Sequence, residues 1–378
     1  MCGTCAGLGG QASGTGGAGG ADEPGGAQVG RRGLLRGAVA GAAGGLAVGA
    51  GLGAAPAQAA PTAGGDVREE TRRRRERAAG SGARLRWLGV AGWELSFNGH
   101  HILVDPYLSR QEYRVPGGEA IDAKGALRPD AAVVEEVAAR HLSGAPELVL
   151  VTHGHFDHLL DVPQLLDRGG DWAKATIRTL CGETHRHLLA GMGVSARRLE
   201  SCVVVSGGEY LRFPAGRDEA PAYTVEVFRS LHSQYGSYGY FAPGTLVSRP
   251  ARPRTLADLV EGGSLAYQVT LGADGLRVMF LSGTANFAER EVAGARPDVL
   301  VLGVSGHTAV HQYVERAMRA LGNPPVVVPS HHDSMLTRLT SPGIGSTVDT
   351  GAVENLRRIV EPLGSRVLQP RHLRQLEL

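Results

Sequence analysis

The pattern of apolar and polar residues becomes regular only from Arg84 onward. Two strand-like runs, Trp93–Phe97 and Ile102–Asp105, flank the dipeptide Asn98-Gly99. Asn-Gly between two such runs is the strongest short-range signal for a β-hairpin. The sequence therefore predicts that the folded part of the chain begins with a hairpin.

Short apolar runs and amphipathic stretches then alternate to the end of the chain. Leu148–Thr152 is apolar up to its last residue, as expected of a strand that is buried on both faces. The other predicted strands lie near residues 176–180, 202–205, 224–228, 264–271, 277–281, 299–302 and 326–328. The predicted helices lie near residues 130–141, 183–192, 310–321 and 352–360. This pattern favours two sheets flanked by helices over a continuous βαβ array, and it predicts one catalytic domain over residues 84–378.

Residues 1–59 are predicted to be a Gly-rich leader with a removable export signal. Gly30–Arg36 contains paired arginines, the uncharged stretch Gly37–Gly53 follows, and Ala57-Gln58-Ala59 offers a small-residue cleavage site. This is the order of a signal peptide, and the paired arginines resemble the twin-arginine pattern. The alternative is a membrane anchor, but the apolar stretch is shorter than the roughly 20 residues that a span needs. We expect export by the twin-arginine machinery to the cell envelope or beyond, without a stable membrane anchor.

A charged linker is expected over residues 60–83. Its densest run, Arg72–Arg75, is flanked by acidic residues and is interpreted as a solvated linker or helix. The whole chain has a formal net charge of +2, with basic and acidic residues interspersed. A nucleic-acid-binding protein needs a basic face, so we expect a small-molecule substrate and no nucleic-acid partner.

The four cysteines do not predict a metal site. Cys2 and Cys5 form a CxxC at the N-terminus, but no second pair accompanies them. Cys181 and Cys202 lie in the body of the chain and could pair in an oxidising compartment if their Cα atoms came close enough. The sequence leaves this disulfide open.

The strongest chemical signal is the cluster His153, His155, Asp157 and His158, which directly follows an apolar strand. Zinc takes nitrogen and oxygen ligands, and a catalytic site keeps one position open for water. Ligands so close in sequence converge only through a tight turn, which Gly154 permits. The spacing predicts a divalent metal site.

These motifs resemble those of the metallo-β-lactamase superfamily, and the resemblance extends from about Arg84 to Leu378. It implies an α/β (α+β) fold, a four-layer αββα sandwich of the metallo-β-lactamase type. It also implies one or two Zn²⁺ ions as the cofactor. Asp105 matches the first motif of the family, His232 the third and His331 the last.

The resemblance also assigns roles to the matching residues. His153, His155 and His232 are implied to hold one metal ion, and Asp157, His158 and His331 to hold a second. Asp105 is expected to orient a metal ligand by a hydrogen bond without itself contacting the metal. Where the second ion is absent, Asp157 would instead orient the attacking water and carry its proton.

One motif departs from the family pattern. Thr284, in Ser282-Gly283-Thr284, stands where the family usually has an aspartate that bridges two metals. A neutral hydroxyl is a poor zinc ligand. The departure implies a single metal, a second metal held without a bridge, or a weakened enzyme, with Asn286 and Asp333 as substitute ligands.

Several other residues have structural and functional interpretations. His100, His101 and His141 are expected at the surface or in the hairpin, and His185 and His187 in solvent on a helix. His332 is expected to face away from His331 if that segment is extended. Gly306-His307-Thr308 resembles a substrate-side loop of lactonase-like members of the family. The aromatic residues after His232 either line the pocket or form a packed loop; they are Tyr235, Tyr238, Tyr240 and Phe241.

The expected activity is metal-assisted hydrolysis by a metal-bound hydroxide. The first and last motifs resemble the branch with lactonases and phosphodiesterases, which favours a lactone, ester or phosphodiester substrate. A binding or sensing protein with the same fold is the alternative, because Thr284 replaces the bridging aspartate. A nuclease is disfavoured, since binding a phosphate backbone needs clustered lysine and arginine.

Overall fold

The computed structural model describes residues 69–70, 72–74, 76–77, 81–118, 120–213, 220–234 and 238–378. The predicted signal over residues 1–59, the CxxC of Cys2 and Cys5, and Tyr235 lie outside these residues. Among the residues described, no helix is long and apolar enough to cross a membrane.

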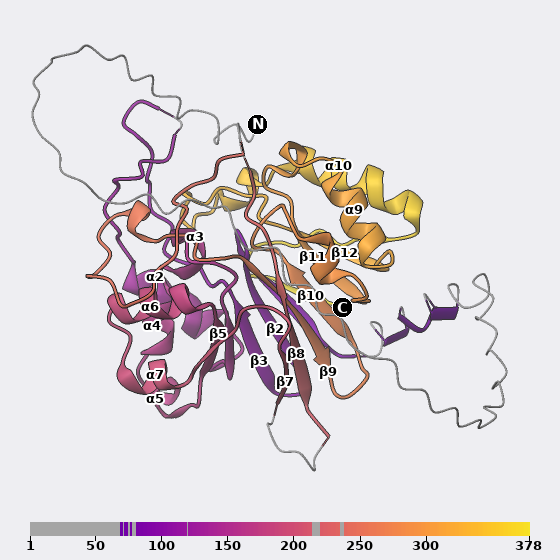
Figure 1. Cartoon of the computed structure of the whole chain (residues 1–378), viewed down its shortest axis with the longest axis horizontal. Coiled ribbons are helices and arrows are strands. Elements are labelled where there is room, and N and C mark those ends of the chain that lie inside the picture. Colours follow the sequence, from indigo (N-terminus) through magenta and orange to yellow (C-terminus); the bar gives the residue numbers. More distant parts are fainter. Residues whose placement is uncertain are drawn as a thin grey trace, which may run out of the picture. The chain divides into compact units, whose positions relative to one another are not determined.

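Two seven-stranded sheets form the centre of the domain (Figure 1). In the first sheet the strand order is β14-β1-β2-β3-β4-β5-β6, and in the second it is β13-β12-β11-β10-β9-β8-β7. The strands of the first sheet are β1 (Arg84–Gly89), β2 (Gly92–Phe97), β3 (His100–Val104), β4 (Leu148–Leu150), β5 (Arg178–Cys181), β6 (Cys202–Val204) and β14 (Gln375–Glu377). Those of the second are β7 (Tyr210–Phe213), β8 (Tyr223–Arg229), β9 (Leu265–Leu271), β10 (Arg277–Leu281), β11 (Val299–Gly303), β12 (Val326–Ser330) and β13 (Arg366–Val367).

Helices cover the outer face of each sheet. The α-helices on the side of the first sheet are α2 (Ala131–Arg140), α3 (Phe156–Leu159), α4 (Val162–Leu166), α5 (Asp171–Lys174), α6 (Glu183–Gly191) and α7 (Ala196–Glu200). Those on the side of the second are α8 (Glu289–Val292), α9 (Tyr313–Ala320) and α10 (Thr350–Val360). In Figure 1, α2, α4 and α6 lie beside β5, and α9 and α10 lie beside β11 and β12. Short 3₁₀ turns complete the connections at Leu256–Asp258, His307–Ala309, Ile344–Thr347 and Glu361–Leu363.

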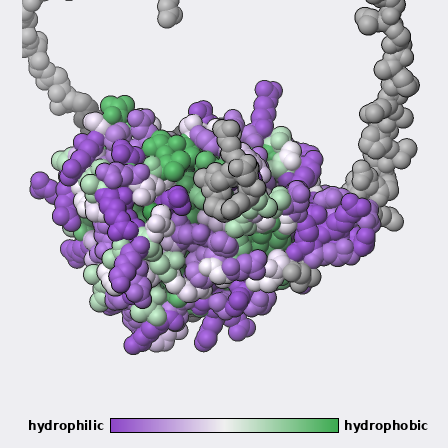
Figure 2. Space-filling model, turned by 90° about the horizontal axis from the view of Figure 1, so that it is seen from below, coloured by the Kyte–Doolittle hydropathy of each residue, from purple (hydrophilic) through white to green (hydrophobic). Residues whose placement is uncertain are grey.

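Three apolar clusters hold these layers together. Trp87, Trp93 and Leu95 of the first sheet meet Tyr267 and Phe280 of the second in the central cluster. A second cluster fills the space under the helices of the first sheet, and a third lies under α9 and α10. The two sheets and the helices on their outer faces confirm the four-layer αββα sandwich. The face shown in Figure 2 is mostly hydrophilic, with a smaller apolar area.

Local sequence signals account for several elements. The hairpin of β2 and β3 turns at Asn98 and Gly99, both with positive φ, in the register that pairs Phe97 with His100. Asp130 caps α2 by accepting hydrogen bonds from the backbone N–H groups of Ala132 and Val133. These elements confirm the predicted hairpin and helix. Strands β7, β13 and β14 and the short helices α4, α5, α7 and α8 were not predicted.

The arginine run does not form a purely solvated linker. The described residues between 69 and 77 are helical, and Arg72 and Arg73 are exposed. Arg74, however, is buried and donates to the carbonyls of Pro297 and Gly322. Arg77 pairs with Asp298 at 2.9 Å, so this segment is attached to the domain.

Cys181 on β5 and Cys202 on β6 lie on neighbouring parallel strands, and both are free thiols in this structure. Their Cα atoms are not direct partners, because Cys181 pairs with Val204 and Cys202 with Thr179. The side chains interact, since each thiol shifts the pKa of the other, raising that of Cys181 and lowering that of Cys202.

Candidate metal centre

The turn after β4 carries four of the predicted ligands. Gly154 lets this turn pack closely against another part of the chain, because a Cβ there would lie 2.2 Å from the carbonyl oxygen of Val260. The Gly154 N–H donates to the carbonyl of Glu261 at 2.9 Å, which fixes the turn against a second segment. His155 then precedes the first turn of α3, which contains Asp157 and His158. All four predicted ligands of this turn are buried.

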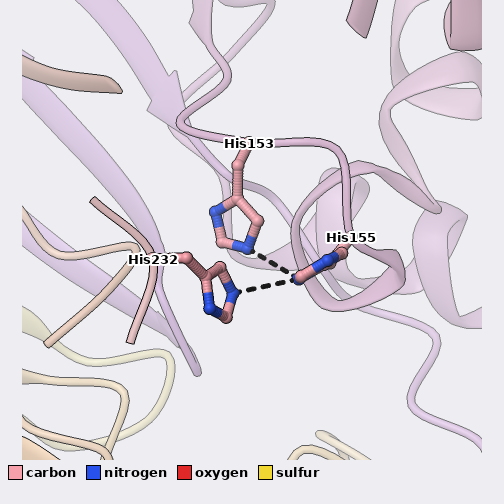
Figure 3. Close-up of side chains that lie close together, drawn as sticks. All are labelled: His153, His155 and His232. Atoms are coloured by element: carbon pink, nitrogen blue, oxygen red, sulfur yellow. Dashed lines mark hydrogen bonds between the residues drawn. The ribbon is translucent and has the colours of Figure 1, made fainter. Parts of the chain in front are cut away.

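The first ligand group is His153, His155 and His232, with one ligand atom of each within 4.8 Å of the others. His232 comes from the segment after β8 of the other sheet. Nδ1 of His155 lies 3.1 Å from Nε2 of His153 and 3.1 Å from Nε2 of His232 (Figure 3). Three ring nitrogens so close together fit the coordination shell of one ion.

All three imidazoles of the first group favour the neutral form. Burial, together with the neighbouring histidines, lowers the pKa of His153 well below its usual value and that of His155 to about 3. Burial also lowers the pKa of His232. A histidine must be neutral to ligate a metal, so this group is ready to bind at neutral pH.

The second group is Asp157, His158 and His331, whose ligand atoms also lie within 4.8 Å of one another. Oδ2 of Asp157 is 3.4 Å from Nε2 of His158 and 3.3 Å from Nε2 of His331. Burial opposes both charges, yet Asp157 and Asp105 raise the pKa of His158 to about 10, and His158 and His331 lower that of Asp157. Nε2 of His158 is buried without a hydrogen-bond partner, as expected of a ligand atom.

Asp105 lies behind the second group. Its Oδ2 accepts a hydrogen bond from Nδ1 of His158 at 2.8 Å, and its Oδ1 accepts one from the Thr152 N–H at 2.7 Å. This leaves Nε2 of His158 free to face Asp157. Such an arrangement fixes the tautomer and orientation of a ligating imidazole.

The hydroxyl of Thr284 bonds two backbone carbonyls. Its Oγ1 donates to the carbonyl of Leu231 at 2.8 Å and to that of Asn286 at 3.3 Å. The two possible substitute ligands bond other groups: Asn286 donates to the carbonyl of His232, and Asp333 pairs with Arg110. The structure brings no carboxylate into the place of the bridging aspartate among the residues that it describes.

The prediction that His185 faces solvent is wrong. His185 is fully buried, accepts from the Gly182 N–H at 3.0 Å, and donates through Nε2 to the Glu261 carbonyl at 3.0 Å. The same carbonyl accepts the N–H of Gly154, so His185 supports the metal-binding turn. The side chain of His187 is also mostly buried, at 16% exposure. The sequence carries no signal for the supporting role of His185, because its partner, the Glu261 carbonyl, is distant in the chain.

The other histidines have mainly structural contacts. The segment is not extended at His331, which has φ 55°, and the His332 ring stacks on Trp87 with 4.5 Å between the ring centroids. His307 is buried and bonds the carbonyl of Val304 and Oδ1 of Asn355. The Gly306-His307-Thr308 turn is thus tied to α10 through His307. Three further histidines are partly buried, namely His100 and His101 in the hairpin and His141 at the end of α2.

The described aromatic residues after His232 have three different surroundings. Tyr240 stacks on the His232 ring with 4.8 Å between centroids, beside the first group. Phe241 meets His155 edge-on at 5.5 Å and also packs against the core. Tyr238 is 84% exposed, so it belongs to the open surface.

Comparisons with known proteins show the family of this chain. The model of the "Beta-lactamase superfamily domain" family matches residues 84–331. A UPF0173 metal-dependent hydrolase of Methanopyrus kandleri is 38% identical over 87 residues, 23% of this chain and 28% of that protein. Another, of Cupriavidus necator, is 24% identical over 270 residues, 70% of this chain and 76% of that protein. The metallo hydrolase Igni18 of Ignicoccus hospitalis is 19% identical with a TM-score of 0.47, covering 78% of this chain and 99% of that one. This chain belongs to the β-lactamase superfamily.

Proposed function

We propose that this chain is a zinc-dependent hydrolase of a small lactone, ester or phosphodiester. The coarser statement, that it is a metal-dependent hydrolase, is supported by its family and by its relatives of that name. One observation carries the proposal: two separate ligand groups converge from the β4 turn, the segment after β8 and the end of β12.

Zinc suits the donor set of both groups. Three imidazoles, or two imidazoles and a carboxylate, are typical ligands of catalytic zinc, which keeps a further position for water. His153, His155 and His232 would hold one ion, and Asp157, His158 and His331 a second. Bound Zn²⁺ lowers the pKa of a coordinated water to about 7 and polarises the oxygen of the scissile group.

The residues of this chain supply orientation and proton transfer. Asp105 accepts the Nδ1–H of His158 and so holds that ring toward Asp157. The Asp157 carboxylate lies between two imidazoles, where it would ligate the second ion or, with that group empty, would orient the attacking water and accept its proton. Tyr240, stacked on His232, presents an aromatic surface beside the first group for the apolar part of a substrate.

A metal-binding or sensing protein is the second candidate function. The observation that favours it is Thr284, whose hydroxyl is bonded to backbone carbonyls and adds no negative charge between the two groups. Two cations without a bridging anion repel each other, which weakens binding of the second ion. Metal binding would then persist without efficient turnover.

The two candidate functions are separated by metal content and turnover of the same purified protein. We would measure zinc and iron per chain, together with hydrolysis of an aryl-substituted lactone, a nitrophenyl ester and bis(nitrophenyl) phosphate. His100→Ala serves as a control that should bind metal and turn over substrate like the unmodified protein, because His100 lies in the hairpin and pairs with Glu147. Zinc with turnover of one substrate supports the hydrolase. Bound metal without turnover supports the sensing protein, and absence of bound metal contradicts both.

Export by the twin-arginine route is also proposed, on the basis of Arg31 and Arg32 ahead of an uncharged stretch. Replacing both arginines with lysine is expected to retain the protein in the cytoplasm. The measurement is fractionation of cells that express the full chain. Normal export of this variant would contradict the proposal.

A further inference from the structure

The backbone around His331 adopts an unusual conformation. His331 has φ 55°, in the left-handed region that non-glycine residues rarely adopt. Val90, in the turn between β1 and β2, has φ 49°, which is still less usual for a β-branched residue. Such conformations persist only where the surroundings impose them, and they concentrate at functional sites.

Val90 and His331 are held to each other. The His331 N–H donates to the carbonyl of Val90 at 2.8 Å. The same carbonyl accepts Nε1 of Trp87 at 3.0 Å and the hydroxyl of Ser330 at 3.2 Å. The turn after β1 therefore determines where the chain leaves β12, and with it the position of the His331 ring.

Asp333 binds the other side of this turn. Its Oδ1 accepts the Val90 N–H at 2.8 Å, and its Oδ2 accepts Nη1 of Arg110 at 2.8 Å and Nε2 of His372 at 2.7 Å. The side chains of Asp333 and Arg110 are both fully buried. We call Val90, Arg110, Asp333 and His372 the Asp333 cluster.

Arg110 extends the cluster into the loop after β3. It donates to the carbonyl of Ser334 at 3.0 Å and to that of Leu88 at 3.2 Å. Gly89 leaves room for it, since a Cβ there would lie 1.6 Å from Nη2 of Arg110. The cluster thus joins the β1–β2 turn, the loop after β3, the end of β12 and the C-terminal segment.

We infer that the Asp333 cluster positions His331 for the second ligand group, with Asp333 and Arg110 as positioning residues that contact no metal. This inference rests on the proposed function, which assigns a metal to that group. A buried ion pair is a weak source of stability compared with apolar packing, because desolvation offsets its attraction. What this pair supplies is geometry: it holds two left-handed residues so that Nε2 of His331 faces Asp157 at 3.3 Å.

The test compares two isosteric variants of buried, arginine-paired carboxylates. Asp333→Asn keeps an acceptor for Val90 but removes the charge that binds Arg110 and His372. The control is Asp298→Asn, because Asp298 is equally buried, pairs with Arg77 and accepts the Arg277 N–H, but belongs to neither ligand group. We expect zinc per chain to fall from two to one in Asp333→Asn and to stay at two in Asp298→Asn. Two ions of unchanged affinity in Asp333→Asn would overturn the inference.

A second measurement tests the inference on protein from which metal has been removed. In the metal-free protein labelled with ¹⁵N-histidine, the His331 ring signals are assigned by their loss in His331→Gln. These signals are expected to shift or broaden in Asp333→Asn and to remain in place in Asp298→Asn. Unchanged His331 signals in both variants would overturn the role of the cluster. If the unmodified protein bound no second ion, the proposed function would fail while this spectrum still decided the positioning role.

Discussion

The two ligand groups lie side by side but differ in the charge of their residues. The first group, His153, His155 and His232, has only imidazoles, and burial keeps them neutral. The second group contains Asp157, whose negative charge is balanced by a protonated His158 when no metal is bound. An ion entering the second group must therefore displace a proton, whereas one entering the first meets neutral rings.

The groups also differ in how they are supported. The first depends on backbone contacts of the β4 turn, through the Glu261 carbonyl that both Gly154 and His185 bind. The second depends on buried carboxylates, since Asp105 orients His158 and Asp333 lies beside His331. The first group is therefore held mainly by backbone hydrogen bonds, and the second by charged residues that are not themselves candidate ligands.

The largest effect is expected from His155→Ala. His155 is the centre of the first group, because its Nδ1 lies 3.1 Å from the ligand atoms of both other histidines. Removing it leaves two ligands, which do not form a catalytic zinc site. We expect loss of the first ion and a fall of hydrolysis to the uncatalysed rate, measured by metal content and turnover. Unchanged zinc content would show that the ligand assignment is wrong.

A smaller effect, confined to the second group, is expected from Asp105→Asn. Asparagine offers one acceptor oxygen in place of two, so it cannot accept from both the Thr152 N–H and Nδ1 of His158. Loss of such a partner typically lowers metal affinity by about 10- to 100-fold. Competition with a chelator would show one ion released earlier and the other unchanged. Asp161→Asn is the matched control, because Asp161 is equally buried but bonds Ser109 and the Leu108 N–H. Equal weakening of both ions would contradict the comparison.

The stability of the metal-free protein is expected to depend on pH through the first group. The folded-state pKa of His155 is about 3, well below that of an unfolded histidine, so only the unfolded state gains a proton as the pH falls below about 6.5. Stability is therefore full above that pH and is lost progressively toward pH 3, by at most about 1.4 kcal/mol per pH unit for each such histidine. Urea unfolding at several pH values measures this slope. His155→Ala should reduce it, and an equal slope in that variant would contradict the expectation.

The smallest effect is expected from Thr284→Val. The variant removes the hydrogen bonds to the carbonyls of Leu231 and Asn286, at a cost of about 1–2 kcal/mol in the free energy of unfolding. Metal content should not change, because the hydroxyl bonds backbone carbonyls and is a poor metal ligand. Urea unfolding and metal analysis measure the two quantities. Loss of an ion in this variant would show that Thr284 acts as a ligand after all.

Local patterns were sufficient for much of the fold. The Asn98-Gly99 turn predicted the first hairpin, the wholly apolar β4 predicted a buried strand, and Asp130 marked the start of α2. Strands β13 and β14 escaped prediction because they are only two and three residues long. Short edge strands acquire their partners from the sheet and have little pattern of their own.

The sequence by itself identified the candidate ligand residues, because imidazoles and a carboxylate crowded after one strand are chemically conspicuous, and the family motifs pointed to His232 and His331. It did not determine what surrounds them. That His185 supports the turn, that Thr284 faces backbone carbonyls and that Asp333 binds Arg110 were decided only by the tertiary structure. The physical reason is that burial and hydrogen-bond partners depend on segments tens to hundreds of residues apart, and these meet only when the two sheets pack.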